Sequence, residues 1–331
     1  MNNLEISSKI NSLITNNQIS GKTDIISYKS CSKKNELVFF IKPEITIAGS
    51  EAVNKTIELS FDLFEKYNIN ITGLSVIGYE YLKKYNIIEE HYGVINMVAK
   101  NGTKVLTSHP KKIFQENFNI DIKDAEVYGG FEFLENYSSF NTNSLNDLWE
   151  SGNRVKLAPG IYCEKHRIDE KEIYILNGFN PFQLSFFTEK DRYIIVFSLS
   201  TDTDWSVLRN EMIGITNPYK ALKGSLRSDL LNLKDTLKID INPGQNGVHL
   251  SAGPIEALAE LVRFFSTLTE NRLEYAETQI GRYLISKGFS PQDLIKMVSN
   301  CKVLYNNENQ YLFDITEEKN LTQMEFLKDF F

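Results

Sequence analysis

The segment NGVHLSAGPIEALAE, residues 246–260, places one histidine, His249, directly ahead of a predicted amphipathic helix. Residues 242–245 have the composition of a turn, so residues 247–251 are expected to form a short strand. Proline is well tolerated in the first turn of a helix, and Gly253-Pro254 therefore marks the start of the helix. The apolar residues that follow recur at helical spacing: Ile255, Leu258, Ala259, Val262 and Phe265. The segment predicts a short strand that leads into a helix.

His249 and Glu260 are candidates for phosphoryl transfer. Backbone N–H groups and the helix dipole favour phosphate near a helix N-terminus. A neutral imidazole there can attack phosphorus, and a carboxylate such as Glu260 can hold its far nitrogen and stabilise the cation that forms. A single histidine among apolar neighbours is more often a structural residue, so the pair by itself leaves both interpretations open.

The same segment resembles the active-site sequence of nucleoside diphosphate kinases, Asn-x-x-His-Gly-Ser with a Glu eleven residues after the His. Four residues match by type and spacing: Asn246, His249, Ser251 and Glu260. In that family the histidine takes a phosphoryl group from a nucleoside triphosphate and passes it to a diphosphate. Leu250 replaces the family's glycine, and Ala252 replaces its aspartate.

A continuous apolar run at residues 37–41 predicts a buried strand, which Lys42-Pro43-Glu44 ends because proline cannot donate to a sheet ladder. A lysine at a strand end is usually a solvated cap. The run resembles the first strand of the kinase family, whose Lys-Pro-Asp lysine contacts the transferred phosphate. The resemblance gives Lys42 this role, with Glu44 in place of the aspartate.

The order of elements after Lys42 also follows the kinase family. A helix is expected at residues 51–67, a strand at 70–79 and a helix at 81–92. This is the first half of the family's ferredoxin-like fold, in which a tyrosine at the position of Tyr92 reaches toward the histidine. A packed ring with a solvated hydroxyl is the alternative for Tyr92. No counterpart of the family's base-stacking phenylalanine follows it.

The third matching segment follows an apolar strand predicted at residues 192–200 and a helix at 205–213. Thr216 and Arg227 match the family's Thr-Asn-Pro and Arg-Gly-Asp motifs, whose Thr and Arg hold the nucleotide's phosphates. A further family arginine falls on Asn210. Arg209 stands one position earlier. Because each residue of a helix is rotated by ~100° from the one before, Arg209 can replace the family arginine only if the helix is shifted.

The sequence predicts an α+β chain in four parts. Residues 1–34 are an N-terminal arm or short helix. Residues 35–99 and 190–268 form a kinase-like core, a ferredoxin-like βαββαβ antiparallel sheet implied by the resemblance. Residues 100–189 are an inserted α+β subdomain, too aromatic for a disordered linker. Residues 269–331 are a helical C-terminal extension. A short strand is also expected at 237–241.

Composition narrows the classes of partner. The net charge of −7 and pI near 5.4 argue against a nucleic acid, which requires a basic face. The three cysteines are scattered and form no metal-binding pattern, which is typical of a reducing cytoplasm. No apolar run approaches ~20 residues, so no membrane partner is expected.

These matches imply a nucleoside diphosphate kinase-like phosphotransferase that acts through phospho-His249. The expected partners are a nucleoside triphosphate or diphosphate, a specialised small-molecule acceptor and further copies of the chain. Mg²⁺ is expected as the cofactor, held by the nucleotide with no protein ligand. The alternative is a catalytically weakened nucleotide-binding or protein-interaction module, such as an effector whose insert docks a partner.

Overall fold

The computed structural model describes residues 3–15, 19–266 and 272–331, and it divides into two compact units. The first contains residues 1–81 and 190–331, and the second contains residues 82–189. The predicted insert, 100–189, lies within the second unit. The predicted junction between core and extension, at 268 and 269, lies outside the described residues. Within the described ranges, no helix has the length and apolar character needed to cross a membrane.

The first unit contains a five-stranded sheet in the order β1-β3-β8-β2-β9, with every neighbouring pair antiparallel. The strands are β1 (Lys22–Ile26), β2 (Asn35–Ile41), β3 (Asn70–Gly78), β8 (Tyr193–Thr201) and β9 (Val248–Leu250). All residues of β2 and β8 are buried. The predicted strands at 37–41, 70–79 and 192–200 are therefore confirmed, and their continuous apolar runs reflect a sheet that is covered on both faces.

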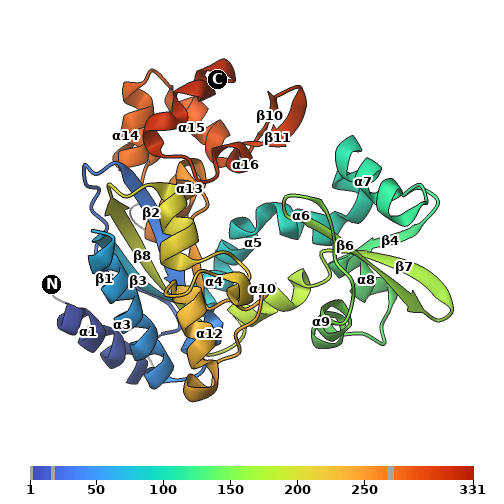
Figure 1. Cartoon of the computed structure of the whole chain (residues 1–331), viewed down its shortest axis with the longest axis horizontal. Helices are drawn as coiled ribbons and strands as arrows, with labels where there is room; N and C mark the ends of the chain where they lie inside the picture. The colour runs from blue at the N-terminus through green and yellow to red at the C-terminus, as the bar shows by residue number, and fades with distance from the viewer. Residues whose placement is uncertain (1–2, 16–18, 267–271) are drawn as a thin grey trace. The chain divides into compact units, whose positions relative to one another are not determined.

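Alternate side chains of β2 show how each face is covered. Phe39 packs against Phe64 of α3 (Ser50–Lys66), with 5.5 Å between ring centroids. Phe40 points to the opposite face and packs against Phe264 of α13 (Pro254–Phe265), at 5.6 Å. Because successive side chains of a strand alternate, neighbouring phenylalanines bind two different helices to one sheet. In Figure 1, α1 (Asn3–Thr15) lies beside α3.

Other helical elements of the first unit are short, except for α12. They are α2 (Pro43–Thr46), α11 (Trp205–Val207), a π-helical segment (Leu208–Ile213), 3-10 turns (Pro218–Lys220 and Tyr275–Glu277) and α12 (Leu226–Leu237). α4 (Tyr79–Lys84) follows β3. The strand expected at 237–241 is wrong: Leu237 ends α12, and Lys238 has a left-handed φ of 54° that breaks any extended run.

The N-terminal arm is more structured than the sequence indicated. β1 adds an edge strand to the sheet by pairing with β3, and Ser75 donates a 2.6 Å hydrogen bond to Asp24. Lys22 donates to the carbonyl of Ser266 at 3.2 Å. The five residues of β1 are half-buried or exposed, so they lack the apolar pattern by which the central strands were predicted.

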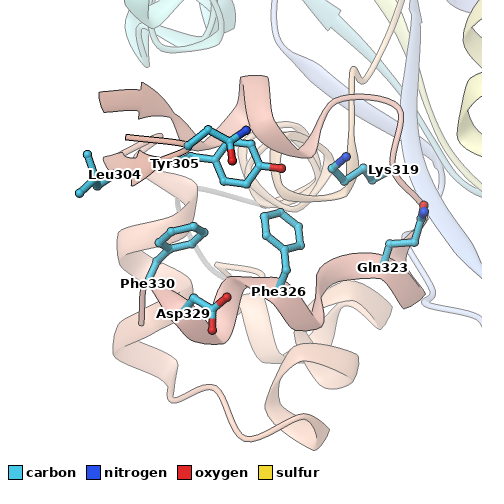
Figure 2. Close-up of a pocket in the computed structure, with 8 residues that line it drawn as sticks. Leu304, Tyr305, Lys319, Gln323, Phe326, Asp329 and Phe330 are labelled. Atoms are coloured by element: carbon cyan, nitrogen blue, oxygen red, sulfur yellow. The ribbon is translucent and has the colours of Figure 1, made fainter. Parts of the chain in front are cut away.

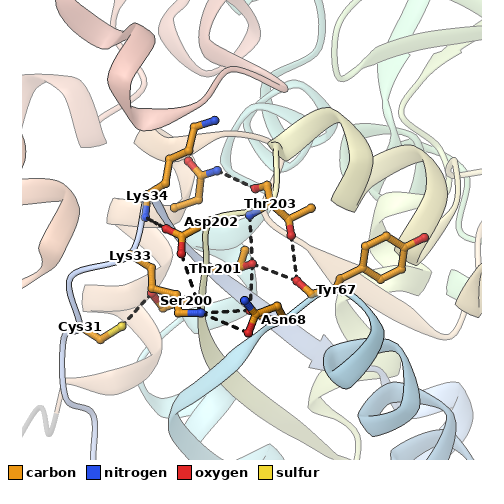
Figure 3. A network of polar contacts seen from close by, with 10 residues as sticks. Cys31, Lys33, Lys34, Tyr67, Asn68, Ser200, Thr201, Asp202 and Thr203 are labelled. Atoms are coloured by element: carbon orange, nitrogen blue, oxygen red, sulfur yellow. Dashed lines mark hydrogen bonds and ion pairs between the residues drawn. The ribbon is translucent and has the colours of Figure 1, made fainter.

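A polar network joins the start of β2, the end of β8 and the turn after α3 (Figure 3). The hydroxyls of Thr201 and Thr203 donate to the carbonyl of Tyr67 at 3.2 and 2.8 Å. Lys33 reaches the carbonyl and side-chain oxygen of Asn68, at 3.3 and 3.4 Å. This network fixes the end of the sheet opposite Lys42.

The second unit has its own four-stranded sheet, β4-β7-β6-β5, in which only the β4–β7 pair is parallel. The strands are β4 (Glu126–Gly129), β5 (Val155–Ala158), β6 (Ile161–Ile168) and β7 (Lys171–Leu176). The helices are α5 (Ile87–His91), α6 (Gly93–Asn101), a 3-10 turn (Gly102–Val105), α7 (Ser108–Phe118), α8 (Gly130–Asn136), α9 (Thr142–Glu150) and α10 (Asn180–Thr188). Residues 100–189, the predicted insert, thus contain both helices and strands.

The C-terminal extension contains α14 (Gln279–Ser286), α15 (Pro291–Val298), α16 (Leu312–Thr316) and a 3-10 segment (Leu321–Asp329). Between these helices, β10 (Lys302–Tyr305) and β11 (Glu308–Tyr311) form a hairpin. The extension packs on α13. Its Asn320 side chain accepts hydrogen bonds from Asn35 at 2.9 Å and from the backbone of Trp205 at 3.0 Å.

Candidate active site

His249 is held on the edge strand β9 by the central strand β2. It stands opposite Phe40 in the antiparallel register, and the two rings stack with centroids 4.5 Å apart and planes inclined by 19°. The imidazole retains 15% of its side-chain exposure. The phenylalanine fixes the plane of the ring, while the edge position keeps part of it in contact with solvent.

Glu260 and Ser251 hold the far side of the imidazole. Nε2 of His249 lies 2.8 Å from Oε1 of Glu260, and Ser251 Oγ donates to the other carboxylate oxygen at 2.5 Å. Ser251 Oγ also accepts the backbone N–H of Val38 at 2.9 Å. The serine is thereby oriented by β2, and both carboxylate oxygens are engaged. Three of the predicted site residues form one hydrogen-bonded chain.

Burial keeps the imidazole neutral. It lowers the pKa of His249 well below its ordinary value, and nearby positive charges, Lys42 first among them, lower it further. Burial also raises the pKa of Glu260 to about 8, although the Ser251 hydrogen bond opposes this. The two groups titrate as a coupled pair. Once the proton shared by His249 and Glu260 is lost, the neutral ring of His249 carries a lone pair and the ionised carboxylate of Glu260 faces its Nε2.

Lys42 and Asn246 are in contact with each other. Lys42 Nζ donates to Asn246 Oδ1 at 2.8 Å, and Asn246 Nδ2 donates to the carbonyl of Thr216 at 3.1 Å. Thr216 itself is exposed. Burial lowers the pKa of Lys42 to about 8, against the opposing charge of Glu44. Lys42 is thus a buried cation near the histidine, charged at neutral pH.

Arg227 lies in the same unit but contacts the backbone. One of its guanidinium nitrogens donates to the carbonyl of Gly214 at 2.8 Å and another to the carbonyl of Val248 at 3.0 Å. Val248 precedes His249, so Arg227 braces the strand that carries the histidine. The planar fork of arginine suits two acceptors held at a fixed spacing.

Arg209 lies in the π-helical segment, whose wider turn shifts the direction of side chains relative to an α-helix. Its guanidinium donates to the carbonyl of Leu250, next to His249, at 3.3 Å and pairs with Glu317 of the extension at 2.7 Å. Asn210 donates to the carboxylate of Glu318 at 3.2 Å. Arg209, rather than Asn210, therefore contacts the strand of the histidine.

Tyr92, the remaining predicted site residue, belongs to the second unit. It lies between α5 and α6, and its ring packs edge-on against His91 at 4.5 Å and Phe187 at 6.1 Å. Its role toward His249 stays a prediction.

Two carboxylates near the histidine were not predicted as site residues. Glu44 accepts the backbone N–H of Gly247 at 2.8 Å and so fixes the turn before β9. Glu256 accepts the backbone N–H of Ala252, and burial together with the charge of Glu260 raises its pKa to about 8. Glu256 and Glu260 are one helical turn apart, so their spacing in the sequence could have indicated that the two carboxylates lie close together.

No protein-family model and no curated protein matches this sequence. Among solved structures, the chain is similar to an NDP kinase from Pyrobaculum aerophilum, with 16% sequence identity and a TM-score of 0.35. The similarity covers 72% of this chain and 98% of the other.

Proposed function

We propose that this protein is a nucleoside diphosphate kinase-like phosphotransferase, in which His249 carries the γ-phosphoryl group of a nucleoside triphosphate to a diphosphate or related acceptor. The observation that carries the proposal is the 2.8 Å contact between His249 Nε2 and Glu260, with Ser251 bonded to the same carboxylate. A structural histidine needs no carboxylate behind it. A nucleophilic one does, since its ring becomes positive on phosphorylation.

Attack would come from Nδ1, because Nε2 faces Glu260. A bond forms between Nδ1 and the γ-phosphorus while the bond from phosphorus to the β,γ-bridging oxygen breaks, and the nucleoside diphosphate leaves. An oxygen of the acceptor then bonds to the same phosphorus as the nitrogen–phosphorus bond breaks. The neutral ring is restored, and Glu260 stabilises the ring's positive charge between the two steps.

Lys42 is the cation we assign to the transferring oxygens. Its present acceptor is the uncharged amide of Asn246, and a phosphate oxygen would be a stronger acceptor for the ammonium group. Thr216, Asn246, Arg227 and Arg209 would complete the phosphate site from two sides of β9. Arg227 can contribute its charge while it still braces the strand.

Magnesium would enter with the nucleotide, whose phosphates would supply its ligands. The charged groups that lower the pKa of His249 are Lys42 and three arginines, which suit phosphate oxygens better than a directly bound metal ion. When bound, the ion would neutralise charge on the phosphate oxygens. The protein's own residues would position the phosphates and the ring.

The strand order supports this assignment. Within the first unit, β2, β3, β8 and β9 follow one another along the chain and are ordered β3-β8-β2-β9 in the sheet. A ferredoxin-like βαββαβ repeat places its first and third strands in the centre and its second and fourth at the edges. We assign these strands to a kinase-like core, with β1 and the C-terminal extension as additions.

A second candidate is a nucleotide-binding or interaction module with weakened turnover. It is favoured by the pairing of Arg209 with Glu317 and by the use of Arg227 on two backbone carbonyls. Both arrangements occupy guanidinium groups that an active phosphotransferase would direct to phosphate.

Incubation with γ-labelled ATP and Mg²⁺ tests the proposal. Label that is labile in acid and stable in alkali, absent from His249→Gln and chased by diphosphates, is the expected result. His109→Gln is the matched control, because His109 is exposed and lies in the second unit. Nucleotide binding by a folded protein that takes no label would favour the second candidate instead.

A further inference from the structure

An open surface cavity of about 480 Å³ lies within the C-terminal extension, more than 50 residues along the chain from His249. Tyr305 at the end of β10 forms one wall, and Phe326 of the last 3-10 segment and Phe330, directly after it, form two others (Figure 2). All three side chains are half-buried. The size suits a small ligand rather than a single water molecule.

The three rings form a nearly equilateral triangle. Ring centroids are separated by 6.1 Å for Tyr305 and Phe326, 6.2 Å for Tyr305 and Phe330, and 6.2 Å for Phe326 and Phe330. The planes are inclined by 61°, 67° and 86°, so no two rings are parallel. No two of these rings can hold a flat nucleobase between parallel faces, whereas a rounded group can contact all three rings.

A cation above the centre of this triangle would lie within the ~6 Å range of all three centroids, the range in which aromatic faces attract positive charge. Two side chains of opposite charge also line the cavity, Asp329 and Lys319. Neither has an ion-pair partner among the residues that the structure describes. In Figure 2, the Asp329 carboxylate and the Lys319 amino group lie on different sides of the rings.

We infer that this cavity binds a small zwitterion in which a quaternary ammonium group is joined to an anionic group. The ammonium group sits on the faces of Tyr305, Phe326 and Phe330, with Asp329 adding attraction. The anionic group pairs with Lys319. Trimethylated nitrogen suits the site because it spreads its charge over a rounded, weakly hydrated surface that is cheaply moved out of water.

Calorimetric titration of the full-length protein tests the class of ligand. Choline, phosphocholine and glycine betaine are compared with 3,3-dimethylbutan-1-ol, which has the shape of choline without its charge. We expect binding of choline at least about tenfold tighter than that of the neutral compound, because the rings recognise charge. Phosphocholine should bind at least about threefold tighter than choline through Lys319.

Four variants assign the contacts. Phe326→Leu keeps an apolar side chain without an aromatic face, and it should weaken choline binding at least about fivefold. Asp329→Asn should weaken binding of choline, and Lys319→Gln should remove only the preference for phosphocholine. Tyr219→Leu is the matched control, because Tyr219 is 60% exposed and lies outside the cavity. Unchanged thermal unfolding would show that each variant is folded.

Sedimentation with lipid vesicles distinguishes two sources of the ammonium group, a lipid headgroup and a free metabolite. Sedimentation with phosphatidylcholine but not with phosphatidylglycerol vesicles would identify a lipid headgroup, and binding of soluble phosphocholine alone would identify a free metabolite. The inference is overturned if the neutral compound binds as tightly as choline. It is equally overturned if wild-type protein binds none of the ammonium compounds at millimolar concentration. Neither result depends on the phosphotransferase proposal.

Discussion

Arg209 and Glu317 form a 2.7 Å ion pair between the π-helical segment and the loop after α16, across 108 positions of the chain. The next residue, Glu318, donates its backbone N–H to the carbonyl of Ala252 at 2.8 Å. Gly253 has no room for a side chain, because a Cβ there would meet the carbonyl of Thr316 at 2.4 Å. The extension thus docks directly on the loop between His249 and its helix.

We expect Glu317→Gln to raise the rate at which ATP labels His249. Removing the carboxylate releases the Arg209 guanidinium, which already reaches the carbonyl of Leu250 and can then turn to phosphate. The pair is partly exposed, so its loss should cost less than about 1 kcal/mol of stability. A rate increase of about two- to fivefold, measured by quenched-flow labelling, is the expected size for one partly screened charge.

Glu325→Gln is the control for this variant, since Glu325 forms a comparable ion pair with Lys287 in the same extension. It should leave labelling unchanged. An identical rate in wild type and Glu317→Gln would mean that Arg209 has no part in phosphate binding.

The labelling rate should depend on pH with a maximum near 8. The His249 and Glu260 pair must lose its proton before the ring can attack, and burial raises the pKa of Glu260 to about 8. The rate therefore rises with pH below this value. Lys42 must stay charged, and its pKa is lowered to about 8, so the rate falls again at higher pH.

Lys42→Arg separates the two limbs of this profile. A guanidinium group stays charged throughout the range, so the fall at high pH should disappear while the rise at low pH remains. A wild-type profile that is flat from pH 6 to 10 would contradict the assignment of both groups.

The central strands and the histidine were predictable because their signals are local. The apolar residues of β2 and β8 adjoin one another in sequence, and His249 and Glu260 lie on successive elements. β1 was missed because its half-exposed residues acquire meaning only from pairing with β3. The contact of Arg209 with Glu317 has no local signal at all, since 108 residues separate the partners.

Arg227 shows a second reason why the role of a site residue could not be predicted from the sequence. Its match to a family motif predicted a phosphate contact, but a sequence does not reveal which backbone carbonyls remain without donors. The structure places the carbonyls of Gly214 and Val248 within its reach. Buried carbonyls need partners, so packing gave the guanidinium a bracing role beside any role in binding.

Glu260→Gln should make the protein more stable at pH 8 relative to wild type than at pH 5. An unfolded glutamate ionises near 4.5, whereas burial raises the folded-state pKa of Glu260 to about 8. Between these values the folded state holds the additional proton, so wild-type stability falls as pH rises through this window. We expect the difference in the free energy of unfolding, measured in urea, to change by more than about 1 kcal/mol.

The relative gain in stability of Glu260→Gln at pH 8 should be accompanied by a loss of His249 labelling, because a neutral amide cannot stabilise the phosphorylated ring. Asp329→Asn removes an exposed carboxylate and is the control, for which the urea curves at both pH values should match wild type. Equal stability differences at pH 5 and pH 8 for Glu260→Gln would mean that this carboxyl is ionised in the folded protein at both values.

Arg227→Lys tests whether this side chain braces the fold or only binds phosphate. An ammonium group cannot reproduce the planar fork, so one of the carbonyls of Gly214 and Val248 would lose its donor. Leaving a buried carbonyl unpaired should cost about 1–3 kcal/mol in the free energy of unfolding. Lys234→Arg, at a half-buried position on the same helix, is the reciprocal control and should change nothing. If Arg227→Lys slows labelling strongly while the urea unfolding curve stays in place, the guanidinium acts on the nucleotide and its backbone contacts are dispensable.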